Sequence, residues 1–171
     1  MDTPTHVGRN AVIVAIDESE SSRAALAWAA TYARDTGSEL QAVHVRPYDF
    51  GAPLIWAPSL VAAAPPGYVD PEVELLHARL QTVLESIAPE PGWTVSMLTG
   101  AAGEQLVHHA RDARVLVLGT REHHGLERLV VGSVSHYCLN HARCPVVVVP
   151  TAVAPVAAAD QDPQIVGGVP A

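Results

Sequence analysis

Short, continuously apolar runs alternate along this chain with longer segments of helical periodicity. Three of the runs are rich in β-branched residues and hold no polar position, at 11–16 (AVIVAI), 115–118 (VLVL) and 146–149 (VVVV). Strands of this kind are typically covered on both faces, as in a parallel sheet between two layers of helices. Two further runs, at 40–45 and 93–98, contain polar residues, and we expect them nearer a sheet edge.

Helical patterns fill the intervals between these runs. We expect helices over 21–35, 71–87, 102–111 and 133–141. The first of them carries a broad apolar face made of Leu26, Trp28, Ala29, Ala30, Tyr32 and Ala33. Gly37 follows that helix where a C-terminal cap belongs, and Asp70 before Pro71 forms an N-cap with a first-turn proline.

The alternation predicts an α/β fold, a three-layer doubly wound parallel five-stranded sheet with right-handed crossovers. With 171 residues, we expect one domain over 1–150. Residues 46–69 hold five prolines without periodicity and are predicted to form a lid or mobile loop. Residues 151–171 are a low-complexity tail, either disordered or a strand that docks on a partner.

The charged residues exclude several classes of function. Ten basic residues against 18 acidic ones give a net charge of -8, which argues against a nucleic-acid partner. All ten basic residues are arginine. The absence of lysine excludes a Walker-type phosphate loop, Schiff-base catalysis and the phosphoacceptor chemistry of receiver domains.

The sequence shows no pattern typical of a targeting signal, a disulfide framework or a zinc site. No apolar stretch approaches the roughly 20 residues of a membrane-spanning helix, and the N-terminus lacks a signal-peptide pattern. Cys138 and Cys144 suggest neither a disulfide framework nor a zinc ribbon. We therefore expect a cytoplasmic protein with reduced thiols and no membrane partner.

In an open α/β sheet, ligands bind beyond the carboxyl ends of the strands. The turn after the first predicted strand begins with Asp17 and contains no glycine, so the dinucleotide-binding fingerprint is absent. An aspartate here is able to accept hydrogen bonds from ribose hydroxyls or an adenine amine. It is equally suited to cap the next helix.

The segment after the fourth predicted strand points to a phosphate site. Gly119 ends a buried strand, where a missing side chain allows a ligand close to the backbone. Gly132 and Ser133 open a helix whose free N–H groups suit phosphate oxygens, with Ser135 as a further hydroxyl donor and Arg121 as the nearest cation. The alternative is that Gly132 and Ser133 only start a helix.

From Gly119 through Gly-Ser-Val-Ser (132–135) to Cys-Pro-Val-Val-Val-Val-Pro (144–150), the chain resembles the universal stress protein domain, over about residues 8–150. ATP-binding members of that family have a glycine, two residues, a second glycine, nine residues, a third glycine, and then serine or threonine. Gly119, Gly132 and Ser133 fill three of these places. Glu122 occupies the place of the second glycine.

The resemblance implies the strand order 3-2-1-4-5 and ATP or another adenine nucleotide as ligand. By that resemblance, adenine and ribose would contact Ala15, Ile16, Asp17, Val45, Leu118 and Gly119. The phosphates would contact Gly132, Ser133, Val134 and Ser135, with Arg121 and Glu122 close by.

Glu122 introduces a carboxylate next to the expected polyphosphate. Two like charges about 4 Å apart at an effective dielectric near 20 repel by roughly 4 kcal/mol, comparable to much of a micromolar affinity. Glu122 has two ways to avoid this, by pairing with Arg121 or Arg128, or by holding a Mg²⁺ ion that bridges to phosphate. The hypothesis is weakened binding, or a preference for AMP-like ligands with less charge.

The remaining polar residues suggest neither a metal site nor a catalytic centre. The histidine pairs at 108–109 and 123–124, with His136 and His141, lack the spacing that converges on one ion and are interpreted as surface residues. No serine lies in a Gly-x-Ser-x-Gly elbow. Asp17 and Glu122 are the only candidate bases near the phosphates.

The last predicted strand bears on assembly. The resemblance makes 146–149 a sheet edge, and proteins normally cover an apolar edge, so we expect a homodimer through this strand unless the tail folds over it. Three functions remain open. They are a stress protein that acts through adenine nucleotide occupancy or partner contacts, a scaffold dimer that binds no nucleotide, and a weak ATP hydrolase.

Overall fold

The computed structural model describes residues 8–47, 70–120 and 132–151. Within these ranges the elements, in chain order, are β1 (Ala11–Ala15), α1 (Glu20–Thr36), β2 (Glu39–Arg46), α3 (Pro71–Ile87), β3 (Thr94–Thr99), α4 (Ala102–His109), β4 (Val115–Gly119), α5 (Ser133–His141) and β5 (Val146–Val149). Every predicted strand and helix is therefore present, with ends that differ from the predicted ones by at most two residues.

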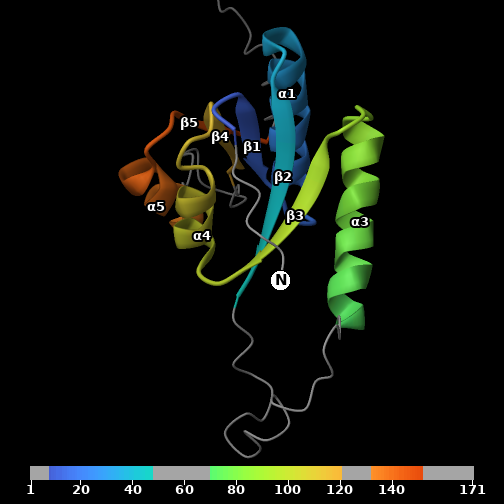
Figure 1. Cartoon of the computed structure of the whole chain (residues 1–171). Coiled ribbons are helices and arrows are strands. Elements are labelled where there is room, and N and C mark those ends of the chain that lie inside the picture. The colour runs from blue at the N-terminus through green and yellow to red at the C-terminus, as the bar shows by residue number, and fades with distance from the viewer. Residues whose placement is uncertain (1–7, 48–69, 121–131, 152–171) are drawn as a thin grey trace, which may run out of the picture.

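The five strands form one parallel sheet in the order β3-β2-β1-β4-β5. Helices α1 and α3 cover one face of it, and α4 and α5 cover the other (Figure 1). The predicted three-layer α/β architecture and the strand order 3-2-1-4-5 are confirmed. The order reverses between β1 and β4, so their carboxyl ends open a crevice at which ligands bind in folds of this type.

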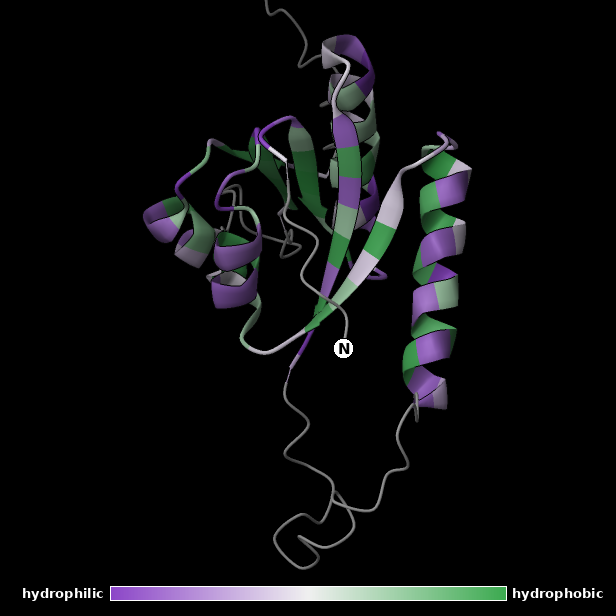
Figure 2. Cartoon of the chain, viewed as in Figure 1, coloured by the Kyte–Doolittle hydropathy of each residue, from purple (hydrophilic) through white to green (hydrophobic). Residues whose placement is uncertain are grey.

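The central strands are apolar because both of their faces are buried. In β1, Val12 and Val14 pack towards α1 and α3, whereas Ile13 packs towards α4 and α5, and all three are fully buried. Figure 2 shows β1 apolar along its length, whereas polar and apolar residues alternate in β2. Of the two strands that contain polar residues, β3 is an edge strand and β2 lies next to it, so the expectation that both lie nearer a sheet edge is confirmed.

Local sequence signals set the ends of the helices. Ser19 is the N-cap of α1, its side chain accepting from Ser22 N, and Gly37 ends the helix in the left-handed conformation at φ 60°. Asp70 caps α3 by accepting from Glu72 N, with Pro71 in the first turn. The predicted roles of Gly37, Asp70 and Pro71 are confirmed.

The apolar face of α1 is narrower than predicted. Ala25, Leu26, Ala29, Ala30 and Ala33 are buried, but the Trp28 side chain is 38% exposed. The Trp28 ring instead stacks on Tyr32 one turn later, with centroids 5.2 Å apart. The alanines let α1 lie close to the sheet, and the wide ring of Trp28 is left at the margin of that contact.

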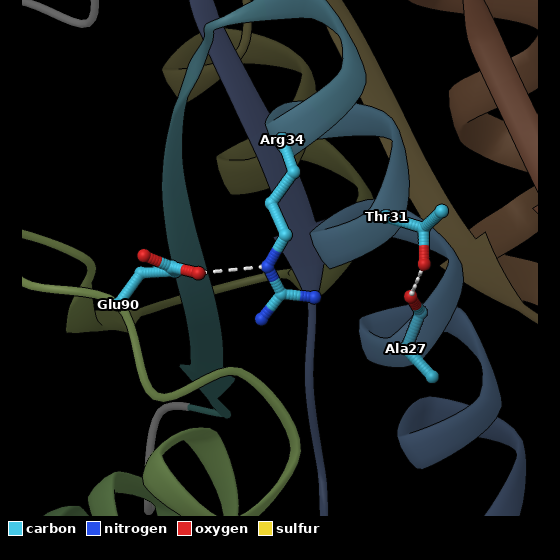
Figure 3. A network of polar contacts seen from close by, with 4 residues as sticks. All are labelled: Ala27, Thr31, Arg34 and Glu90. Atoms are coloured by element: carbon cyan, nitrogen blue, oxygen red, sulfur yellow. Dashed lines mark hydrogen bonds and ion pairs between the residues drawn. The ribbon is translucent and has the colours of Figure 1, made fainter.

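An ion pair joins α1 to the segment that follows α3. Arg34 Nε lies 2.8 Å from Glu90 Oε1, and its guanidinium group lies over the Trp93 ring, 5.3 Å from the centroid. Figure 3 shows Arg34 reaching across to Glu90, with the Thr31 hydroxyl donating to the Ala27 carbonyl on the same helix. These contacts lie at the end of the molecule opposite the carboxyl ends of the strands.

Two predicted segments fall largely outside the description. Of the predicted lid segment 46–69, the structure describes only Arg46, the last residue of β2, and Pro47. Of the predicted tail 151–171, it describes only Thr151. In the parts of the chain that are described, no helix has both the length and the apolar character needed to cross a membrane.

Candidate functional site

A cavity of about 360 Å³ lies at the carboxyl ends of the central strands, where the strand order reverses. This volume is within the range of small-ligand pockets. Its walls are formed by the residues after β1, by the ends of β2 and β4, and by the amino-terminal parts of α1, α4 and α5. The lining consists of Ala15, Ile16, Asp17, Ser19, Ser21, Ser22, Val43, His44, Val45, Pro47, Ala102, Leu106, Leu118, Gly119, Gly132, Ser133, Val134 and Ser135.

Asp17 organises the turn that leads from β1 into α1. Its Oδ1 accepts from Ser19 N at 2.9 Å and from the Ser19 hydroxyl, a local turn typical of aspartate. Ser19 in turn caps the helix, and Ser22 Oγ donates to the Asp17 carbonyl oxygen at 2.6 Å. Asp17 is therefore not the helix cap itself. It holds Ser19, which is the cap, in place, and it also lines the cavity.

Gly119 is required by packing against α1. A Cβ built at this position would lie 2.6 Å from the carbonyl carbon of Ser21 and would overlap its oxygen. The sequence interpretation, that a missing side chain there admits a ligand, is therefore incomplete. The first turn of α1 already occupies that space, and the close approach of β4 to α1 closes one wall of the cavity.

The amino end of α5 also borders the cavity. Gly132 is its N-cap at φ -63°, and no side chain of the described residues caps it. The first turn of any helix presents N–H groups without intrahelical partners, and the helix dipole adds partial positive charge there. A Cβ on Gly132 would meet no atom of the described chain within 4 Å.

The two serines of this turn differ in accessibility. Ser133 is exposed, whereas Ser135 is 5% exposed and its hydroxyl donates to the Gly119 carbonyl oxygen at 3.5 Å. Ser135 therefore links α5 to the end of β4. Of the two hydroxyl groups, that of Ser133 is the more accessible.

His44 was not among the predicted site residues, although it lines the cavity. Its Nδ1 lies 2.8 Å from the carbonyl oxygen of Ile16, and Ile16 N donates to the Val43 carbonyl at 2.9 Å. A carbonyl oxygen only accepts, so Nδ1 carries the proton in this bond. The ring thus ties the end of β2 to the segment just beyond β1.

The structure gathers ten of the twelve predicted binding residues around this one cavity. They are Ala15, Ile16, Asp17, Val45, Leu118, Gly119, Gly132, Ser133, Val134 and Ser135. The other two, Arg121 and Glu122, lie outside the described residues. Contact of any of the twelve with a nucleotide stays a prediction.

Sequence reasoning missed eight of the lining residues, which are Ser19, Ser21, Ser22, Val43, His44, Pro47, Ala102 and Leu106. Ser21 and Ser22 belong to the first turn of α1, and the run of serines after Asp17 is the signal that would have found them. His44 is a polar residue between two valines near the end of β2. Ala102 and Leu106, on α4, carry no signal, because only the packing of α4 against β2 brings them to the cavity.

Among residues 8–47, 70–120 and 132–151, no group of three or more histidine, cysteine, aspartate or glutamate side chains is placed to hold a metal ion. His109, which the sequence analysis interpreted as a surface residue, is partly buried. Its Nε2 lies 2.8 Å from Gln41 Oε1, and Gln41 Nε2 donates to Ser96 Oγ at 2.6 Å. Burial, followed by the neighbouring charge of His108, lowers the pKa of His109 below its usual value.

Both cysteines are free thiols on the α4–α5 side of the sheet. Burial, together with the nearby Cys144, raises the pKa of Cys138 to about 11. Burial also raises the pKa of Cys144. Thiolate formation is suppressed at neutral pH, so neither side chain is an activated nucleophile.

The model of the universal stress protein family matches residues 8–150. The chain belongs to this family. Among curated relatives, universal stress protein YxiE of Bacillus subtilis is 28% identical over 149 residues, covering 82% of this chain and 98% of the relative.

Solved structures share the fold. A universal stress protein in complex with cAMP is 18% identical, with a TM-score of 0.55 over 84% of this chain and 98% of that one. The universal stress protein from Archaeoglobus fulgidus in complex with dAMP is 21% identical, with a TM-score of 0.54 over 81% of this chain and 95% of that one. At these identities the likeness concerns architecture alone.

Proposed function

We propose that this universal stress protein binds an adenine nucleotide in the cavity at the carboxyl ends of its strands and acts in stress adaptation through occupancy of that site or through partner contacts. The observation that carries the proposal is the convergence of apolar walls and of α5 N–H groups, which no described side chain caps, on one cavity of about 360 Å³. The complexes of related folds with cAMP and dAMP support the choice of an adenine ligand.

The phosphate end of the ligand is assigned to α5. The N–H groups of Ser133, Val134 and Ser135 belong to the first turn of a nine-residue helix without a side-chain cap among the described residues. Oriented N–H groups and the helix dipole favour an anion even in a lysine-free protein. The exposed Ser133 hydroxyl adds a further donor.

The base is assigned to the end of the cavity at β2. β2 and β4 lie on either side of β1, so they are about 10 Å apart at ordinary strand spacing. A nucleotide with its phosphates at α5 therefore extends its base across β1 towards Val45. Val45, Ala102 and Leu106 give that end an apolar wall suited to the face of a purine.

Glu122 is expected to tune which nucleotide is preferred. It lies outside the described residues, and its proposed effect rests on the sequence motif alone. A carboxylate near the phosphates disfavours ATP more than AMP unless Mg²⁺ bridges the charges. Glu122→Gly should therefore raise the affinity for ATP more than that for AMP, and equal affinities in both proteins would remove the idea.

We further propose a cytoplasmic homodimer joined through β5. The free thiols of Cys138 and Cys144 suit a reducing compartment. β5 is an edge strand of four valines, all of them partly exposed, and pairing with a second copy would cover it.

The nucleotide proposal is tested with a charge placed at the start of α5. Ser133→Asp adds an anion where helix N-termini favour one, so the free energy of unfolding should be kept or raised by roughly 0.3–1 kcal/mol. The same charge repels phosphate, so the affinity for ATP measured by calorimetry should fall at least about tenfold. Adenosine should be affected much less, because it has no phosphate.

Ser133→Asn is the matched control, since it keeps the size and polarity of Asp without its charge, and it should bind ATP nearly as the wild type does. Mass spectrometry of ligand released from freshly purified protein gives an independent readout. If no adenylate is released and calorimetry is silent towards ATP, AMP and adenosine, the scaffold dimer becomes the better account.

A further inference from the structure

We propose that Trp28 and Leu139 anchor a second copy of this chain, one on each face of the sheet beside the open edge of β5. The inference rests on the homodimer proposed above and names the side chains that hold it together. Three large apolar side chains are exposed among the described residues, Trp28 at 38%, Leu75 at 55% and Leu139 at 50%. Two of them, Trp28 on α1 and Leu139 on α5, belong to helices that contact β5.

β5 alone offers too little surface to hold two copies together. It is the outermost strand on its side of the sheet and has four residues (Figure 1), whereas a stable interface uses about 20–30 residues on each partner. Its valines are all partly exposed, with Val147 and Val149 on the α1 side and Val146 on the α4–α5 side. A dimer built on this edge therefore needs apolar contacts from the helices on both faces.

On the first face, Trp28 lies on the flank of α1 that faces β5. Arg34 marks the other flank, because it pairs with Glu90 and lies over the Trp93 ring, both of which follow α3 (Figure 3). At 100° per residue, the buried face of α1 lies between Trp28 and Arg34. Stacking on Tyr32 restricts the indole ring, so little side-chain freedom is lost when a partner covers it.

On the second face, Leu139 lies on the flank of α5 that faces away from α4. Tyr137 marks the α4 flank, since a Cβ built on Gly103 would lie 2.7 Å from its ring. Leu139 is two residues further on, about 200° around the helix, with the buried Cys138 between them. Because α4 packs over β2 and β3 whereas α5 packs on β5, the flank that carries Leu139 faces the β5 edge.

The symmetry of a homodimer brings like surfaces together at this edge. A two-fold axis makes two copies of one edge strand antiparallel and, in a continuous sheet, stands normal to that sheet. Each face then continues into the same face of the other copy, so the two Trp28 side chains approach over one face and the two Leu139 side chains over the other. Ala24, Trp28 and Tyr32 recur every four residues along α1, which gives this flank an uncharged stripe suited to an apolar surface like itself.

The test measures dissociation of the full-length dimer by sedimentation equilibrium. Trp28→Glu and Leu139→Glu should each raise the dissociation constant at least about tenfold, because each buries a charge in an apolar contact. Trp28→Phe keeps an aromatic ring and should remain dimeric. Leu75→Glu is the matched control and should associate as the wild type does, because α3 packs against β3 at the other edge of the sheet.

Trp28 and Leu139 already face water in the monomer, so their substitution should leave the melting temperature of the dilute monomer near that of the wild type. If either Trp28→Glu or Leu139→Glu associates as the wild type does, the inference is overturned and the β5 homodimer stands. A wild type that is monomeric at every concentration overturns both. A chain that dimerises only after deletion of 151–171 would show that the tail covers this surface, and that result also overturns the inference.

Discussion

Gly119 allows β4 to pack in close contact with the first turn of α1. A Cβ on Gly119 would lie 2.6 Å from the Ser21 carbonyl carbon, and backbone atoms cannot move aside as a flexible side chain does. Gly119→Ala should therefore lower the free energy of unfolding by about 1–3 kcal/mol, as expected for overpacking. Urea denaturation at neutral pH measures the loss.

Gly132→Ala is the comparison for that experiment. It has open space around the added methyl group within the described chain and a φ of -63°, which any residue adopts. Its cost should stay below about 1 kcal/mol, the difference between glycine and alanine at an N-cap. Equal losses in the two variants would show that the contact between Gly119 and Ser21 is not tight.

Residues whose role is local were predictable from the sequence. Gly37 and Asp70 cap helices through their own backbone and side-chain geometry, which needs only a few neighbouring residues. The exposure of Trp28 and the partial burial of His109 were not predicted, because they depend on how the helices pack against the sheet. Gln41, the partner of His109, is 68 residues away in sequence.

At the scale of elements, a partly buried chain of polar side chains joins α4 to β2 and β3. His109 on α4 donates from Nε2 to Gln41 Oε1, and Gln41 donates to Ser96. Glutamine oxygen only accepts, so the neutral Nε2–H tautomer of His109 satisfies the network. Burial and the charge of His108 lower the pKa of His109, so protonation is less favourable in the folded state than in the unfolded chain.

The sign of the resulting pH dependence follows from linkage. The unfolded chain binds the proton more tightly, so the contribution of His109 is complete above its ordinary pKa of about 6.5 and is lost as the pH falls below it. Free energies of unfolding measured at pH 7.5 and pH 5.5 should differ more in wild type than in His109→Leu. At pH 7.5 that variant should itself be about 1 kcal/mol less stable, because Gln41 loses a partner.

His108→Leu is the control, because it removes a neighbouring histidine and keeps His109. His108 is exposed and its side chain makes no hydrogen bond among the described residues, so its replacement should preserve most of the pH dependence. If His109→Leu shows the same pH dependence as wild type, another group is responsible.

At the scale of the whole molecule, the exposed edge of β5 determines how two copies would meet. The carbonyls of Pro145 and Val149 accept from β4 and from Thr120, so the odd-numbered backbone groups face inward and those of Val146 and Val148 face the open edge. Proline is tolerated in an edge strand when its nitrogen faces outward.

Val148→Pro should therefore retain the monomer fold while abolishing the homodimer that we propose. Val148→Thr keeps the backbone N–H and the β-branched shape and should remain dimeric. Sedimentation equilibrium distinguishes the two. Deletion of 151–171 should leave the dimer intact, and a monomer after that deletion, or a dimeric Val148→Pro protein, would contradict the β5 interface.

The sequence by itself determined the class of fold, since buried parallel strands must be apolar on both faces and amphipathic helices must cover them. The family motif added the strand order and located most of the cavity lining. Only the tertiary structure decided that Gly119 packs against the first turn of α1 and that His44 and Leu106 line the same cavity. Those relations depend on distances between elements remote in the chain, which local propensity and periodicity do not encode.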